Sequence, residues 1–185
     1  MRTIVFIDTY KSGSSRDAIQ AAEALGLFTV LLTDSKSFVK KRTEFPDVHL
    51  MMHLDIDDHD AIRKTLRSLE EQGKTIEAIV SFIDSYVYPA ARLADERDIN
   101  RISKKAVKKM EDKILTREAL ADTPYSPYHS IYEPSESLSA FIKEQKSRLP
   151  LIVKSPNSCG SKDVRLAKKR ADLEVHMEKL LHNYP

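Results

Sequence analysis

Short apolar runs separated by helical segments most constrain the fold of the first hundred residues. Residues 3–7, 28–32, 48–54 and 76–82 are expected to be strands. Residues 78–80 are continuously apolar, which is typical of a strand covered on both faces in a parallel sheet. Apolar residues with helical spacing lie between the strands and after the last one. The alternation predicts an α/β fold with a doubly wound, Rossmann-like parallel sheet over residues 1–100.

The pattern changes after about residue 100. A charged helix pair is expected over 104–122, followed by a proline-punctuated stretch and a helix that includes Phe141. Strands are expected at 151–154 and 164–167, and a last helix at 171–182. These elements predict a second, small α+β domain over residues 101–185.

Composition excludes several classes of protein. The chain is 41% hydrophobic, and it carries 30 basic and 28 acidic residues. Its net charge of only +2 does not indicate the basic surface that nucleic-acid binding requires. No apolar run approaches the roughly 18 residues of a membrane span. The first residues enter a strand pattern at once, which argues against a signal peptide. A single cysteine, Cys159, favours a reducing, cytoplasmic setting.

The most informative motif is a lysine at the end of a strand. Lys154 ends the apolar run 149–153, and a small, polar loop with Ser158, Gly160 and Ser161 follows it. An ammonium group beside a loop with few bulky side chains can hold phosphate oxygens. The loop is not a Walker P-loop, because the G-x-x-x-x-G-K-[ST] pattern is absent. An ordinary solvent-exposed lysine remains the alternative.

A second lysine motif lies upstream, Met110-Glu-Asp-Lys113, and begins a helical segment at 115–120. With Pro150-Leu-Ile-Val-Lys154 and the loop 155–163, it resembles the N-terminal part of ATP-grasp ligases. That part is a pre-ATP-grasp domain followed by the first ATP-grasp subdomain, as in biotin carboxylase, carbamoyl-phosphate synthase large subunits and amino-acid ligases.

The resemblance implies that Lys113 and Lys154 contact ATP phosphates and that the loop with Ser158, Gly160 and Ser161 closes over them. It implies an ATP-dependent carboxylate–amine or carboxylate–thiol ligase that acts through an acyl-phosphate, with ATP, Mg²⁺ and a small carboxylate as ligands. In that family the adenine hinge, the magnesium ligands and the catalytic arginine come later in the chain. The chain is therefore expected to be an N-terminal fragment that is inactive alone, with no assignable catalytic residue.

A substrate site is expected in the first domain. The turn 11–15, with Gly13 and Ser14, lies between a strand and a helix, where backbone N–H groups can bind an anion. Asp84 follows the fourth strand, at the sheet edge where α/β proteins place ligands. The alternatives are structural: Ser14 and Asp17 match a capping box, and Asp84 matches an N-cap.

Other readings carry less weight. The acidic stretch 55–60 departs from an EF-hand loop, and His49 and His53 have no third ligand nearby, so no metal site is predicted. Cys159 is interpreted as incidental. A non-catalytic nucleotide- or small-ligand-binding module remains the rival function. An oxidoreductase is disfavoured because the G-x-G-x-x-G fingerprint is absent.

Overall fold

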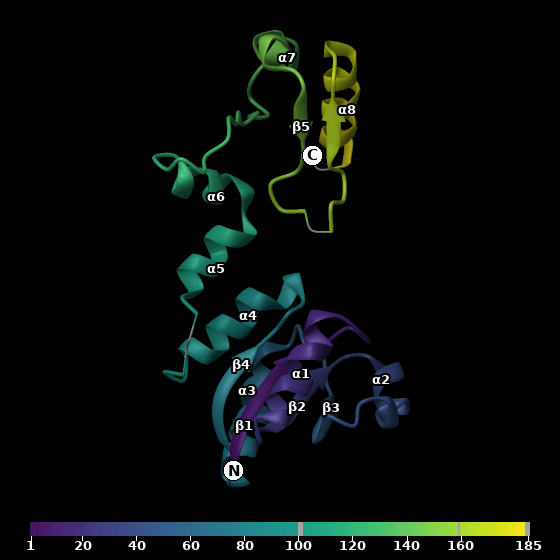
Figure 1. Cartoon of the computed structure of the whole chain (residues 1–185), viewed down its shortest axis with the longest axis vertical. Coiled ribbons are helices and arrows are strands. Elements are labelled where there is room, and N and C mark those ends of the chain that lie inside the picture. Colours follow the sequence, from purple (N-terminus) through teal and green to yellow (C-terminus); the bar gives the residue numbers. More distant parts are fainter. Residues whose placement is uncertain (100–101, 159, 184–185) are drawn as a thin grey trace. The chain divides into compact units, whose positions relative to one another are not determined.

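The computed structural model describes residues 1–99, 102–158 and 160–183 (Figure 1). The chain forms two compact units, Met1–Lys108 and Lys109–Pro185. The expected boundary between residues 100 and 101 falls on residues outside the described ranges. Each unit is built around its own core.

The first unit is a parallel sheet of four strands in the order β3-β2-β1-β4. The strands are β1 (Arg2–Ile7), β2 (Phe28–Thr33), β3 (Leu50–His53) and β4 (Thr75–Val80). β1 pairs on both sides, so that Val5 lies opposite Val30 of β2 and Ile79 of β4. This arrangement confirms the predicted α/β fold.

Helices cover both faces of this sheet, and alternate residues of each strand point to opposite faces. Val5 and Ile7 pack in one core with α3 (His59–Glu71) and α4 (Asp84–Asp95). Phe6 packs in the other core with Ile19 of α1 (Ser14–Ala24), and Phe38 of α2 (Lys36–Lys40) lies against it. The sequence pattern did not predict α2 or the 3₁₀ turn Arg42–Glu44, because neither is long enough to show a period.

The second unit contains an antiparallel pair of strands, β5 (Leu151–Val153) and β6 (Arg165–Ala167). Val153 and Ala167 pack with residues of α7 (Leu138–Gln145) and α8 (Arg170–Asn183). Of the charged helix pair, α6 (Lys113–Leu120) belongs to this unit, whereas α5 (Lys104–Glu111) spans the boundary between Lys108 and Lys109. A 3₁₀ turn, Lys146–Arg148, precedes β5. The order of helices and strands follows the predicted α+β pattern.

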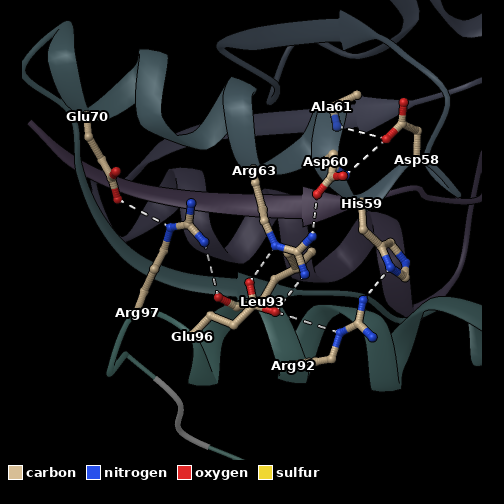
Figure 2. A network of polar contacts seen from close by, with 10 residues as sticks. All are labelled: Asp58, His59, Asp60, Ala61, Arg63, Glu70, Arg92, Leu93, Glu96 and Arg97. Carbon is tan, nitrogen blue, oxygen red and sulfur yellow. Dashed lines mark hydrogen bonds and ion pairs between the residues drawn. The ribbon is translucent and has the colours of Figure 1, made fainter.

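A polar network joins α3 to α4 in the first unit (Figure 2). Arg63 donates to both carboxylate oxygens of Glu96, at 2.7 and 2.8 Å, and to Asp60 at 2.7 Å. The hydrogen bonds from Arg63 lower the pKa of the Glu96 carboxyl. A second pair, Arg97 with Glu70, lies at 3.5 Å. The network ties together the two helices that cover one face of the sheet.

A buried ion pair secures the opposite face. Arg16 in the first turn of α1 donates to Asp47, and their side chains are only 7% and 8% exposed. The Arg16 guanidinium also lies 4.6 Å from the centre of the Phe45 ring. Because Asp47 precedes β3, the pair fixes the start of α1 to the edge of the sheet. Removing one partner would leave a buried charge without compensation.

We therefore predict that Asp47→Ala lowers the free energy of unfolding by about 3 kcal/mol, since Arg16 would stay buried without its carboxylate. Urea denaturation followed by circular dichroism measures the change. The double variant Arg16→Met/Asp47→Leu is the control and should lose less than Asp47→Ala alone. A free energy of unfolding within 0.5 kcal/mol of wild type for Asp47→Ala (about the size of a neutral surface change) would contradict the prediction.

Candidate functional site

Lys113 is the first residue of α6, and Asp112 is the residue that sets the start of this helix. The Asp112 carboxylate accepts hydrogen bonds from the backbone N–H groups of Ile114 and Leu115, at 2.8 and 3.1 Å. A cation at a helix N-terminus is unfavourable because the helix dipole places partial positive charge there. The positive charge of Lys113 therefore needs nearby oxygen atoms that accept hydrogen bonds from its ammonium group.

The loop after β5 supplies these oxygen atoms. The Lys113 ammonium donates to the carbonyl oxygen of Pro156 at 2.9 Å and to the carbonyl oxygen of Ser158. The Lys113 backbone N–H also donates to Pro156, at 3.3 Å. The fold thus brings Lys113 to the loop that follows Lys154, although the two lysines are far apart in the sequence.

Lys154 directly follows β5 and lies in a cluster of positive charge. Partial desolvation, together with the charges of Arg117 and Lys113, lowers the pKa of the Lys154 ammonium. Sequence reasoning missed Arg117. The sequence feature that could have identified Arg117 is its position four residues after Lys113, since residues at this spacing share one face of a helix.

The loop itself turns sharply. Gly160 and Ser161 both have positive φ, +60° and +57°, and the Ser161 carbonyl accepts a hydrogen bond from Val164. The Ser158 hydroxyl is buried and has no hydrogen-bond partner among the described residues. Cys159 lies outside those residues. Three cations beside a loop with an unpaired hydroxyl form an arrangement that suits phosphate oxygens.

The predicted substrate residues follow two neighbouring strands of the first unit. The chain moves outward from β1 to β2 and β3 and then returns to the other side of β1 as β4. This reversal is a topological switch point, where open α/β sheets place their ligands. The turn with Gly13 and Ser14 follows β1, and Asp84 follows β4.

The capping roles considered for these residues are not seen in the structure. Gly13 is the N-cap of α1, with φ 85° and ψ −166°, and no side chain caps this helix, so Ser14 forms no capping box. Ser15 instead accepts hydrogen bonds from the backbone N–H of Tyr10 and the hydroxyl of Thr9, both at 3.0 Å. Asp84 is the first residue of α4 and not its N-cap, which is Ile83.

Asp8 is a further acidic residue at the same edge, and sequence reasoning passed over it. It directly follows β1, with φ 56°, and its carboxylate accepts a hydrogen bond from the Thr33 hydroxyl at 2.8 Å. Burial, reinforced by the nearby charge of Asp34, raises the pKa of the Asp8 carboxyl in spite of that hydrogen bond. Burial and surrounding aspartates, Asp57 first, also raise the pKa of Tyr86.

The histidines considered as metal ligands have other partners. His49 Nδ1 lies 3.1 Å from the backbone nitrogen of Thr29 and 2.8 Å from its hydroxyl. His53 Nε2 lies 3.0 Å from the carbonyl oxygen of Asp34. Within the described residues, no group of three His, Cys, Asp or Glu side chains is placed to hold a metal ion. No helix in the described part of the chain is long and apolar enough to span a membrane.

Comparison with solved structures places this fold. An L-amino acid ligase from Bacillus licheniformis matches 98% of the chain with a TM-score of 0.70 and 19% identity. N5-carboxyaminoimidazole synthetase from Staphylococcus aureus, complexed with ADP, matches 95% with a TM-score of 0.71 and 19% identity. The biotin carboxylase domain of Hydrogenobacter thermophilus 2-oxoglutarate carboxylase, with MgADP and bicarbonate, matches 96% with a TM-score of 0.68 and 16% identity.

The chain spans 42%, 44% and 40% of those three structures. No curated protein matches its sequence. Residues 19–98 match the family model of the ATP-grasp N-terminal domain. This match covers β2, β3 and β4 of the parallel sheet, the helices α2, α3 and α4, and the second half of α1.

The raised pKa of Asp8 leads to a prediction about stability. A carboxyl whose pKa is higher in the folded state stabilises the fold below the unfolded-state value near 3.8, and this stabilisation is lost as pH rises through the folded pKa. Asp8→Asn should therefore be more stable than wild type at pH 7. We expect a gain at the lower end of the roughly 0.5–2 kcal/mol of single stabilising changes.

Urea denaturation at pH 3 and pH 7 checks this expectation, and the gain should be confined to the higher pH. Asp98→Asn is the matched control, because Asp98 is also an aspartate with positive φ, 55°, but is exposed. A gain of equal size for Asp8→Asn at both pH values would show that the charge of Asp8 is not its cause.

Proposed function

We propose that this chain, whose residues 19–98 match the ATP-grasp N-terminal domain, forms the first part of an ATP-dependent ligase that joins a carboxylate to an amine or a thiol. The observation that carries the proposal is the convergence of Lys113 and Lys154 on the loop after β5. The two lysines are proposed to bind the phosphates of ATP, and Ser158, Gly160 and Ser161 to line the same loop.

The chemistry of the donor set supports this assignment. When ATP binds, it supplies the phosphoryl group that activates the carboxylate as an acyl-phosphate. The ammonium groups of Lys113 and Lys154 would offset negative charge on the phosphate oxygens as it redistributes. Carbonyl oxygens already orient Lys113, which reduces the reorganisation needed when an anion binds.

Magnesium is assigned to a different part of the enzyme. The described residues provide cations for phosphate but no group of three metal-binding side chains. We therefore propose that the magnesium ligands belong to a part of the enzyme outside this chain. Since the chain spans about two fifths of the ligases that it resembles, we expect no ligation by the chain alone.

The first unit is proposed to bind the carboxylate substrate. Backbone N–H groups at Gly13 and Ser14, at the start of α1, would donate to a carboxylate, and the positive end of the α1 dipole would favour it. Asp84 at the start of α4 would accept hydrogen bonds from an ammonium group. Because both segments border the switch point between β1 and β4, this pair of groups suits an amino acid.

The first test concerns the lysines. In the complete enzyme, Lys113→Ala and Lys154→Ala should each lower kcat/KM for ATP about 100-fold, the usual loss when one donor to a developing charge is removed. ADP release measures the rate. Lys179→Ala, which removes an exposed lysine of α8, should leave the rate unchanged. Wild-type rates in both Lys113→Ala and Lys154→Ala would refute the assignment.

The second test concerns the substrate pocket. Asp84→Ala should raise KM for the amino-acid substrate identified by an ADP-release screen about 10-fold or more, because an ammonium would lose a charged partner. KM for ATP should not change. Asp98→Ala serves as the control, since Asp98 is an exposed aspartate elsewhere in the first unit. An unaltered KM for the substrate in Asp84→Ala would remove Asp84 from the pocket.

A further inference from the structure

We propose that Arg117 is a third phosphate-binding cation, and that with Lys113 and Lys154 it makes this site selective for a chain of phosphates over a single phosphate. The inference rests on the proposed function and extends it to a residue outside both lysine motifs. It follows from the position of Arg117, from its lack of an acidic partner, and from the charge already gathered beside it.

Position is the first observation. Arg117 lies four residues after Lys113 in α6, so both side chains leave the same face of one helix. Like charges at this spacing destabilise a helix by a few tenths of a kcal/mol. Lys154 reaches the same region from the end of β5, where Arg117 and Lys113 are the two charges that disfavour its protonation. Three cations therefore converge from a helix and a strand.

The lack of a partner is the second observation. Arg117 is half-buried, yet its side chain has no hydrogen bond or salt bridge to any residue in the described part of the second unit. Glu118, the next residue in the sequence, forms no salt bridge with Arg117 in the described part of the second unit. The Asp112 carboxylate accepts hydrogen bonds from the backbone N–H groups of Ile114 and Leu115. The arginines that form salt bridges elsewhere each face a carboxylate: Arg2, Arg16, Arg63, Arg92, Arg97 and Arg170.

The positive charge and the arginine geometry of this site favour a polyphosphate ligand. A half-buried arginine residue beside two ammonium groups raises the free energy of the site until an anion binds. The planar fork of an arginine can donate two parallel hydrogen bonds to phosphate oxygens. Cations supplied by two separate elements match the spread charge of a polyphosphate better than the compact charge of one phosphate.

The test is calorimetric titration of this chain with tripolyphosphate, ATP and AMP at low ionic strength. Arg117→Gln should weaken the binding of tripolyphosphate and of ATP at least 10-fold and that of AMP less than about twofold. Arg67→Gln, which removes an exposed arginine of α3, is the matched control and should bind all three ligands like wild type. An equal loss for AMP and ATP would mean that Arg117 acts on the fold, and would overturn the proposal.

Two further outcomes separate this proposal from the function on which it rests. If Lys113→Ala and Lys154→Ala lose tripolyphosphate binding while Arg117→Gln keeps it, the phosphate site stands and Arg117 is not part of it. If wild type binds neither tripolyphosphate nor ATP, the phosphate site itself is refuted, and Arg117 with it.

A second measurement avoids any variant that fails to fold. Phenylglyoxal modifies arginine side chains, and mass spectrometry of the wild-type chain reports the rate at each site. Tripolyphosphate should slow the modification of Arg117 several-fold and leave that of Arg67 unchanged. Equal rates at Arg117 with and without tripolyphosphate would overturn the proposal.

Discussion

The parallel pairing of β1 with both β2 and β4 is the constraint on which the first unit depends. A strand paired on both edges and covered on both faces is mainly apolar, and Val5, Phe6 and Ile7 meet that demand by pointing to alternate cores. The chain builds the sheet from β1 outward through β2 to β3, and then crosses back to the other side of β1 to form β4. That reversal leaves the turn after β1 and the start of α4 at one edge, so the packing that stabilises the sheet also positions the proposed substrate groups.

Ionic groups in this protein divide into two kinds. Arg16 is paired with Asp47, which holds α1 to the sheet edge. Arg63 is paired with Glu96, which holds α3 to α4 (Figure 2). The other kind is not neutralised: Asp8 is partly buried near Asp34, and Lys154 lies near Arg117 and Lys113. Such groups lower the stability of the folded protein. They are typical of binding sites, because a bound ligand of opposite charge removes the electrostatic repulsion.

The sequence-based predictions of helix starts were least accurate where one local pattern is compatible with two structures. Ser14 and Asp17 have the spacing of a capping box, but Gly13 occupies the N-cap with a positive φ, and the hydroxyl of Ser15 turns back to Tyr10. Asp84 looked equally suited to an N-cap and to a ligand group, and the helix begins at Asp84 itself. The helix α2 was missed because five residues are too few to display a period.

Continuous apolar runs and helical spacing are local properties that survive without tertiary contacts, so the parallel sheet and the order of its elements could be predicted from the residues alone. The sequence also marked Lys113 and Lys154 through their motifs. The hydrogen bonds of Lys113 to the carbonyl groups of Pro156 and Ser158 become visible only in the folded chain. The same holds for the position of Arg117 beside Lys154 without an acidic partner among the described residues. Those contacts join α6 to the loop after β5. These two segments are far apart in the sequence, so the closeness of their charges depends on how the chain packs and cannot be predicted from a local sequence pattern.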